Sequence, residues 1–406
     1  MSPLKPPPAP SPFVALGASA VGWADPQRKI AFDAWLAGVT TAYQLLSGSL
    51  RVASADASFR RYLRIDSASG GSFIIMDAPP GQENSEPFVR IAALMLEAGL
   101  NVPRILDWDE ARGFMLLSDL GAQTLMDVID RERPQANQGL YLQAVDALLM
   151  WQRASRPGVL PPYDAALLRR ELALFPDWYL ARHRGVAVEG ALRETLDKTF
   201  ATIVARNLAA PSVYVHRDFM PRNLMAPMRS ALPRAPGLAT SSAALPPEDA
   251  VSPGGGPAAK RPPATPQLGV LDFQDAVYGP VTYDIASLMR DAFLSWEEDF
   301  VLDITVRYWD KARRIGLLDF EDWHRDFGAF YRSVEWMGLQ RHLKVAGIFA
   351  RLTLRDGKPK YLADTPRFIG YIRATASRYR ELTPLLRLID RVEGTGAATG
   401  YAYGRV

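Results

Sequence analysis

Strand-forming segments are concentrated in the first 121 residues of this sequence, and this limits the folds open to the chain. A helical stretch, "RKIAFDAWLAGV", precedes three β-prone runs, which are "LRVASAD", "FRRYLRI" and "SFIIMDAPP". "SEPFVRIAALMLEAGL" has helical periodicity and stops at Gly99, and "RILDWDEARGFMLLSDLG" indicates a hairpin with its turn at residues 109–113. The simplest sum of these elements is a small five-stranded antiparallel sheet with one helix.

Helices predominate after Thr124. The clearest are "QGLYLQAVDALLMWQRAS", "AALLRRELALFPDWYLARH" and "ALRETLDKTFATIVARNLA", and residues 282–386 are again helical and rich in Trp and Tyr. Two short apolar runs, "SVYV" and "LGVLDF", are each followed by polar residues, as expected for strands that deliver side chains to a site. The whole pattern predicts an α+β protein whose second part is mostly helical.

Amino-acid composition indicates which kinds of partner and which kinds of metal site are expected. The 406 residues are 48% hydrophobic, enough for one large or two moderate cores, and their net charge of +3 is too balanced for a nucleic-acid groove. We therefore expect a small-molecule partner and no nucleic acid. The absence of cysteine excludes disulfides and thiolate metal sites and fits a reducing compartment. The four histidines show no metal-ligand spacing, so a zinc enzyme is not expected.

Three segments have compositions that do not favour packing. Residues 1–24 combine the Pro-rich "SPLKPPPAPSP" with a short apolar stretch, which indicates a disordered cytoplasmic tail rather than a signal sequence. Residues 226–267 contain ten prolines and "SPGGGP", which predicts a flexible insertion, and residues 388–406 are expected to form a flexible tail. No run approaches the 18 apolar residues that a membrane span needs, so we expect no membrane contact.

Two motifs carry the chemistry of phosphoryl transfer. "HRDFMPRNL" places Asp218 five residues before Asn223, and Asp272 follows a strand-like run in "LGVLDFQD". Transfer from ATP needs a group at the acceptor hydroxyl and oxygen ligands for the magnesium ions that screen the phosphates. An Asx-type turn would explain the first motif but leaves the second unexplained. Gln274 and Asp275 either support this second loop or cap a turn.

The ordered motifs resemble a known family. The pattern His-x-Asp-x-x-x-x-Asn, an apolar run ending in Asp, and "YGPVTYDIASLMRD" are similar to the aminoglycoside phosphotransferase and choline kinase family of protein-kinase-like small-molecule kinases. The resemblance extends over about residues 25–385 and includes "LLSDLG" as the hinge between lobes. It implies a bilobal protein-kinase-like fold with an N-lobe at 25–121 and a C-lobe at 122–387.

The resemblance implies roles at matching positions and the cofactors ATP and Mg²⁺. Asp218 takes the place of the catalytic base, and Asn223 and Asp272 take those of the Mg²⁺ ligands. Asp284 matches a carboxylate that braces the catalytic loop, and His216 is expected to be a packing residue of that loop. Backbone groups are expected to face the adenine at four positions, which are Leu117, Ser118, Asp119 and Leu120.

The chain departs from typical protein kinases at the phosphate site. "RVASADASFRRYLRI" has no glycine and "SFIIMDAPP" has no lysine, so phosphate recognition must use other groups. Ser54 and Ser58 are candidates for hydroxyl and backbone donors, and Arg60, Arg61 or Arg64 for the missing charge. Because strand residues alternate, Arg60 and Arg64 share a face that Arg61 does not. A solvated arginine face is the alternative for each of them.

The narrower resemblance concerns the phosphate acceptor. "SFRRYLR", "IIMDAPP" and "EWMGLQRHLKVAGIFARL" are similar to segments of family members that phosphorylate the anomeric hydroxyl of N-acetylmuramate and N-acetylglucosamine in cell-wall recycling. The late helix places an aromatic and polar groups at intervals of three to four, which suits a sugar. The predicted acceptor contacts are Trp336, Gln340 and Lys344, with Arg341, His342 and Arg351 for a carboxylate; structural packing is the alternative for each.

Two other functions stay open at this point. The first is a kinase for another small alcohol, such as an aminoglycoside or choline, although the Arg- and Lys-rich late helices favour a neutral or anionic acceptor. The second is a catalytically silent nucleotide-binding protein, for which the missing lysine is the best argument. We expect a cytoplasmic monomer that acts on an amino sugar.

Overall fold

The computed structural model describes residues 21–55, 59–227 and 267–395. These residues fall into two compact units. The first contains residues up to Val89 together with Pro103–Ala122, and the second contains Arg90–Val102 and the described residues after Gln123. Residues 90–102, which fall within the N-lobe predicted over 25–121, group with the second unit, and the predicted lobe boundaries stay a prediction.

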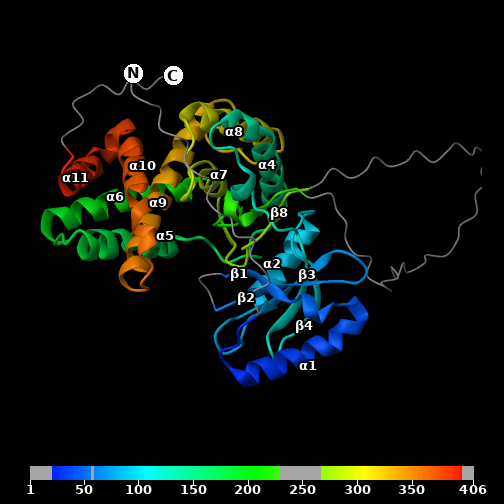
Figure 1. The fold of residues 1–406 in the computed structure, drawn as a ribbon. Helices are drawn as coiled ribbons and strands as arrows, with labels where there is room; N and C mark the ends of the chain where they lie inside the picture. The colour runs from blue at the N-terminus through cyan, green and yellow to red at the C-terminus, as the bar shows by residue number, and fades with distance from the viewer. Residues whose placement is uncertain (1–20, 56–58, 228–266, 396–406) are drawn as a thin grey trace, which may run out of the picture. The chain divides into compact units, whose positions relative to one another are not determined.

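The first unit is built on the expected five-stranded antiparallel sheet, with strand order β1-β2-β3-β5-β4. Its elements are α1 (Pro26–Tyr43), η1 (Ser47–Ser49), β1 (Arg51–Ala55), β2 (Arg61–Asp66), β3 (Ser72–Asp77), β4 (Ile105–Asp109) and β5 (Phe114–Ser118). Helix α2 (Glu86–Glu97) lies between β3 and β4 in the chain (Figure 1). The predicted strands and hairpin are confirmed.

Helix α1 covers one face of this sheet. Alternate strand residues point to the same face, so the sheet contributes Leu63 and Ile65 of β2 and, from the next strands, Phe73, Ile75, Phe114 and Leu116. Helix α1 supplies Phe32, Trp35, Leu36 and Val39 to the same core. Trp23 also packs here, with its ring centroid 4.8 Å from that of Phe32. The predicted tail therefore ends earlier than residue 24, because Trp23 buries apolar surface; residues 1–20 lie outside the described chain.

The second unit is mostly helical, and helix α9 packs against α5, α6, α7 and α10. Its helices are α3 (Leu125–Val128), α4 (Gln138–Arg153), α5 (Ala165–Leu174), α6 (Gly190–Ala209), α7 (Tyr283–Met289), α8 (Glu298–Arg314), α9 (Phe327–Leu354), α10 (Thr365–Arg378) and α11 (Thr383–Glu393). Short 3-10 turns are η2 (Pro134–Asn137), η4 (Pro221–Asn223), η5 (Pro359–Asp364) and η6 (Arg380–Leu382). The strands β6 (Ser212–Val215) and β9 (Val277–Pro280) pair, as do β7 (Leu224–Met225) and β8 (Gly269–Val270).

Three boundaries differ from the sequence-based expectations. The helix predicted over 165–183 changes at Leu174 into a π-helix, η3 (Phe175–His183), where Pro176 cannot donate a backbone hydrogen bond. The apolar run at 268–273 is a strand only over Gly269–Val270. The flexible tail predicted from residue 388 begins too early, because α11 continues to Glu393 and buries Leu388 and Ile389.

The predicted insertion at 226–267 lies almost entirely outside the described residues, as does the end of the chain from 396. Within the described ranges, no helix combines the length and apolar character that crossing a membrane requires.

Candidate active site

The loop that follows β6 and the loop that follows β8 meet at Asn223 and Asp272. Strands β7 and β8 pair with Leu224 opposite Val270, which brings the two loops to the same end of this short ladder. The backbone N–H of Leu271 donates to the Asn223 carbonyl at 2.9 Å, and Asn223 Nδ2 donates to Asp272 Oδ2 at 3.2 Å. Two of the predicted site residues are therefore in direct contact.

The side chain of Asn223 is oriented by a second hydrogen bond. Its Nδ2 also donates to the backbone carbonyl of Asp218 at 2.9 Å, which leaves Oδ1 as the atom for a cation to meet. Asp272 Oδ1 accepts from Gln274 Nε2 at 2.9 Å, so Gln274 supports this loop. Asp272 has a positive φ of 63°, which is unusual for a non-glycine residue. Its side chain is exposed.

The side chain of His216 contacts both the loop of Asp218 and the loop of Asp272. Its ring is buried, and Nε2 lies 2.9 Å from the carbonyl of Leu271. Since a carbonyl only accepts, Nε2 carries the proton, and Nδ1 accepts the backbone N–H of Asp218 at 3.3 Å. Burial lowers the pKa of His216, which favours this neutral form. The imidazole therefore fixes the backbone beside Asp218 and is not placed as a base.

Asp284, at the start of α7, lies under the same loop. Its carboxylate is fully buried, and its two oxygens accept the backbone N–H groups of His216 at 2.7 Å and Arg217 at 3.0 Å. Burial raises the pKa of Asp284, while the imidazole and the two N–H donors act in the opposite direction. This is the geometry that a bracing carboxylate requires.

Arg217 reaches away from the site into a buried ionic cluster. Its φ of 79° is in the left-handed region, and its Nη2 pairs with Glu171 Oε1 of α5 at 2.6 Å. Lys344 Nζ pairs with the same oxygen at 2.9 Å, and Gln340 Nε2 donates to Glu171 Oε2 at 3.1 Å. Burial raises the pKa of Glu171, but Lys344 and Arg217 outweigh it and lower the pKa to about 2. Glu171 was not identified from the sequence.

The predicted acceptor contacts are largely covered by the protein. Arg341 is buried and donates through Nη1 to the Arg217 carbonyl at 2.8 Å, while Gln340 and Lys344 contact Glu171, the partner of Arg217. Trp336 is only 2% exposed and packs edge-on against Tyr379. The aromatic face expected to stack on a sugar is therefore inside the core.

The other two predicted carboxylate contacts lie elsewhere on α9. His342 stacks on Tyr371 with ring centroids 4.6 Å apart, and its Nε2 lies 3.3 Å from the Arg290 carbonyl. Burial lowers the pKa of His342 to about 3. Arg351, in the last turn of α9, is half-buried. Packing on all sides of α9 is the reason that helical spacing alone did not separate contacts from core.

The arginines predicted for the phosphate site are each paired within the first unit. Arg60 pairs with Glu83 at 3.2 Å, Arg61 pairs with the buried Asp77, and Arg64 pairs with Asp119 at 2.6 Å. The backbone of Ser54 pairs with Tyr62 of β2, and Ser58 lies outside the described residues. Of the predicted adenine-facing positions, Leu117 and Ser118 end β5, and Asp119 and Leu120 follow it.

The donor set suits magnesium better than a metal held wholly by protein. No group of three or more His, Cys, Asp or Glu side chains that could hold a metal occurs in the part of the chain that the structure describes. Mg²⁺ instead commonly takes one or two protein oxygens, with phosphates and water completing its shell. Asn223 Oδ1 and the exposed Asp272 carboxylate are such oxygens, on side chains that are in contact through Asn223 Nδ2.

Comparisons with known proteins place the chain in a family. The model of the phosphotransferase enzyme family matches residues 49–230 and 264–326. An N-acetylmuramate/N-acetylglucosamine kinase from Pseudomonas putida is 45% identical over 352 residues, covering 87% of this chain and 91% of that protein. The protein of the same name from Neisseria meningitidis is 43% identical over 369 residues, covering 91% of this chain and 97% of the relative.

Solved structures share the fold at low sequence identity. The GDP complex of aminoglycoside 2'-phosphotransferase-IIIa has a TM-score of 0.53 at 13% identity, covering 86% of this chain and 99% of that one. An amicoumacin kinase in complex with AMP-PNP and Ca²⁺ has a TM-score of 0.51 at 12% identity, covering 84% of this chain and 92% of that one. The likeness confirms the expected protein-kinase-like fold.

Proposed function

Because the chain belongs to the phosphotransferase enzyme family, we propose that it is a sugar kinase that transfers the γ-phosphoryl group of ATP to the anomeric hydroxyl of N-acetylmuramate or N-acetylglucosamine. The products are the sugar 1-phosphate and ADP. Two relatives that are named for these acceptors support this substrate class, and each aligns with most of the chain. The 1-phosphate suits a role in the recycling of cell-wall sugars.

The observation that carries this proposal is the contact between Asn223 and Asp272 beside the loop of Asp218. We propose that Asn223 Oδ1 and the Asp272 carboxylate hold Mg²⁺, which would screen the charge of the ATP phosphates. Phosphoryl transfer is largely a matter of positioning and charge, and here one hydrogen-bonded unit positions both loops. A silent nucleotide-binding protein would not need this arrangement.

Asp218 is proposed as the base at the acceptor. Its half-buried carboxylate would accept the proton of the anomeric hydroxyl as the oxygen attacks phosphorus, late in the transfer because this hydroxyl is more acidic than an ordinary alcohol. Asp284 and His216 hold the backbone N–H groups of residues 216–218, up to Asp218 itself, and Asn223 holds the Asp218 carbonyl. They are proposed to position the base.

The acceptor side is proposed to use the exposed face of the same loop. Arg222 directly precedes Asn223 and is exposed, and its guanidinium lies over the Phe293 ring at 4.8 Å. Within the described residues no ion pair of Arg222 is found, whereas Arg217 pairs with Glu171 and Arg341 donates to a backbone carbonyl. We propose that Arg222 binds the carboxylate of the N-acetylmuramate lactyl group, and that Gln340, Arg341 and Lys344 act on the sugar only through the loop they support.

The test is an ADP-release assay over a panel of acceptors. We expect turnover with both amino sugars and little with an aminoglycoside or choline. Asp218→Asn is expected to bind ATP normally and to lose roughly 100-fold or more in kcat, since general bases contribute about 10²–10⁴-fold. Turnover of another alcohol without either amino sugar would reject the substrate. ATP binding with no turnover of any acceptor would favour the silent protein. A cytoplasmic location and a monomeric state are kept as parts of the proposal.

A further inference from the structure

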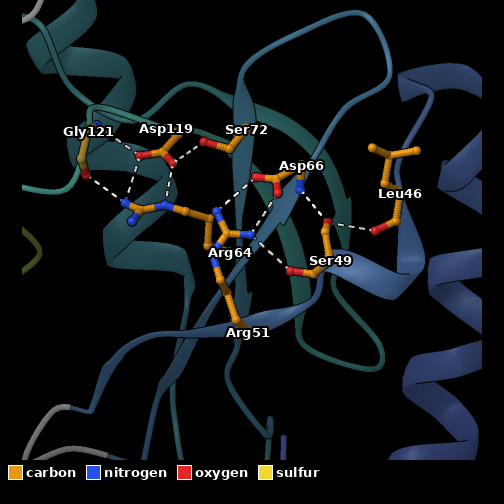
Figure 2. Close-up of polar contacts among 8 residues, drawn as sticks. All are labelled: Leu46, Ser49, Arg51, Arg64, Asp66, Ser72, Asp119 and Gly121. Atoms are coloured by element: carbon orange, nitrogen blue, oxygen red, sulfur yellow. Dashed lines mark hydrogen bonds and ion pairs between the residues drawn. The ribbon is translucent and has the colours of Figure 1, made fainter. Parts of the chain in front are cut away.

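Arg64 reaches across the sheet of the first unit to the segment that follows β5. In register, Arg64 of β2 lies opposite Ile74 of β3, and Ile74 lies opposite Leu117 of β5. The guanidinium spans this distance and meets Asp119 twice, from Nε to Oδ2 at 2.6 Å and from Nη2 to Oδ1 at 3.1 Å. Ser72 Oγ adds a donor to Asp119 Oδ2 at 2.7 Å (Figure 2). The carboxylate thus ties three strands together.

The same guanidinium also holds Gly121. Arg64 Nη2 donates to the Gly121 carbonyl at 2.6 Å, and the Gly121 N–H donates to Asp119 Oδ1 at 2.8 Å (Figure 2). Gly121 has a φ of 110°, which other residues rarely adopt, so the close turn depends on glycine. We refer to Arg64, Ser72, Asp119 and Gly121 as the Arg64 clamp. Its ion pair is sheltered, with side-chain exposures of 17% for Arg64 and 7% for Asp119.

The other side of the segment is fixed by Ser118. Its N–H donates to the Arg104 carbonyl at 2.9 Å, and its Oγ accepts the Arg104 N–H at 2.8 Å. Between these two anchors, the backbone N–H and C=O groups of Asp119 and Leu120 make no hydrogen bond to the described residues. Both residues are half-buried, and backbone polar groups in such a place normally find a partner. The clamp and Ser118 therefore fix both ends of a short segment whose backbone N–H and C=O groups are available to a ligand.

We propose that Arg64 is a positioning residue for the nucleotide base, acting through Asp119 and Gly121 to fix the unpaired backbone groups of Asp119 and Leu120. The inference rests on the proposed use of ATP. The edge of a purine base presents hydrogen-bond donors and acceptors side by side. Backbone N–H and C=O groups recognise that edge only if the protein holds them at a matching, fixed spacing. Adenine carries an amino group where guanine carries a carbonyl, so the same spacing favours one purine. Arg64 is then not a substitute for the missing phosphate-binding lysine.

A second ion pair in the same sheet supplies a matched control. Arg51 of β1 pairs with Asp66 of β2 at 2.8 Å, also in a two-pronged contact, and its Nη1 reaches the Ser49 carbonyl (Figure 2). This pair is more exposed, at 34% and 39%, and none of its hydrogen bonds reaches residues 118–121. Its link to the clamp is a charge interaction with Asp119, the smallest of the effects that raise the pKa of Arg51. Arg51→Met removes a cross-strand arginine while leaving every hydrogen bond of the Arg64 clamp in place.

The experiment compares Arg64→Met, Arg51→Met and the wild type. We expect Arg64→Met to raise both KM and the calorimetric Kd for ATP about tenfold, since one charge-assisted contact of this kind contributes on that scale. KM for the sugar should stay within about twofold, and the preference for ATP over GTP in kcat/KM should fall. Ser72→Ala should shift the same quantities by about two- to threefold, because Asp119 keeps its other donors. Arg51→Met should behave as the wild type.

A role limited to stability would lower the folded fraction and hence kcat, without moving KM for ATP or the purine preference. Unchanged nucleotide parameters in Arg64→Met, or an equal shift in Arg51→Met, would overturn the inference. If Arg64→Met does not fold, Ser72→Ala decides by the same criterion. The Kd measurement needs no turnover, so a wild type that binds ATP but phosphorylates neither sugar rejects the proposed function and leaves this test in force.

Discussion

Asn223 Nδ2 donates to Asp272 Oδ2 at 3.2 Å, although the two residues stand 49 positions apart in the sequence. The contact exists because β7 and β8 pair in a register that puts Leu224 opposite Val270. Asn223 therefore belongs both to the loop of Asp218, whose carbonyl it binds, and to the loop of Asp272. A change at either residue is felt by both loops.

This relationship predicts a dependence on Mg²⁺ that differs between the two residues. Asp272→Asn removes a charge that would face the metal and should lower kcat by roughly 100-fold or more, the scale of losing a key electrostatic contact. Asn223→Ala should mainly raise the Mg²⁺ concentration that gives half-maximal activity. Magnesium titrations at saturating ATP and sugar measure both effects. Gln274→Ala, which only loosens Asp272, should give a smaller change than either; a larger one would contradict the assignment.

The ionic cluster beneath the loop predicts a pH-dependent stability. Since the folded-state pKa of Glu171 is lowered to about 2 from 4.5, its stabilising contribution is complete above about pH 4.5 and is lost as the pH falls toward 2. Glu171→Gln leaves Lys344 and Arg217 without a counter-charge and should lower the free energy of unfolding by about 3–5 kcal/mol at pH 7. Urea unfolding should show this difference shrinking below pH 4.5.

The same substitution should also act on the reaction. Arg217 precedes Asp218 and holds a left-handed φ, so loss of its partner should loosen the base and lower kcat about tenfold at pH 7, with KM for ATP little changed. Steady-state kinetics well below the unfolding temperature separate this effect from stability. A stability difference that stayed constant from pH 7 to pH 3 would show that Glu171 is not the titrating group.

The sequence predicted which residues meet at the candidate site, because short spacings are preserved by local structure. Asp218 and Asn223 lie in one loop, and Asp272 follows β8 after a single residue, so their types and order were sufficient. The five-stranded sheet was predictable for a similar reason, since its strands alternate and its turns carry glycine.

Partners that meet only through tertiary packing were not predictable. Glu171 is one acidic residue on an amphipathic helix, and nothing local marks it as the counter-charge of Arg217. The sequence gives the charge of Arg64 and the face of its strand, and these are compatible with phosphate binding. It does not show that Asp119 lies across β3 within reach of Arg64. Trp336 sits in a helix buried on all sides, where a spacing of three to four no longer distinguishes a surface from the core.

Arg222 predicts a difference between the two proposed acceptors. N-acetylmuramate carries a lactyl carboxylate that N-acetylglucosamine lacks, so Arg222→Gln should lower kcat/KM about tenfold for N-acetylmuramate alone, the scale of one charge-assisted contact. N-acetylglucosamine serves as the internal control in the same enzyme preparation. Arg222→Lys should recover part of the loss, because it keeps the charge without the two-pronged geometry. An equal loss on both sugars would place Arg222 at the phosphates.

Replacing glycine by alanine is expected to have opposite effects on stability at two positions of α9. A Cβ at Gly347 would lie 2.3 Å from the Leu174 carbonyl oxygen and 2.7 Å from Leu174 Cβ, where α5 ends and the π-helix begins. Gly347→Ala must push these helices apart and should destabilise the protein by about 1–3 kcal/mol or more. A Cβ at Gly338 meets nothing closer than 3.8 Å, so Gly338→Ala should be neutral or add up to about 1 kcal/mol through helix propensity. Chemical unfolding of both variants gives the comparison. Equal destabilisation would mean that backbone flexibility in α9, rather than contact with Leu174, requires glycine there.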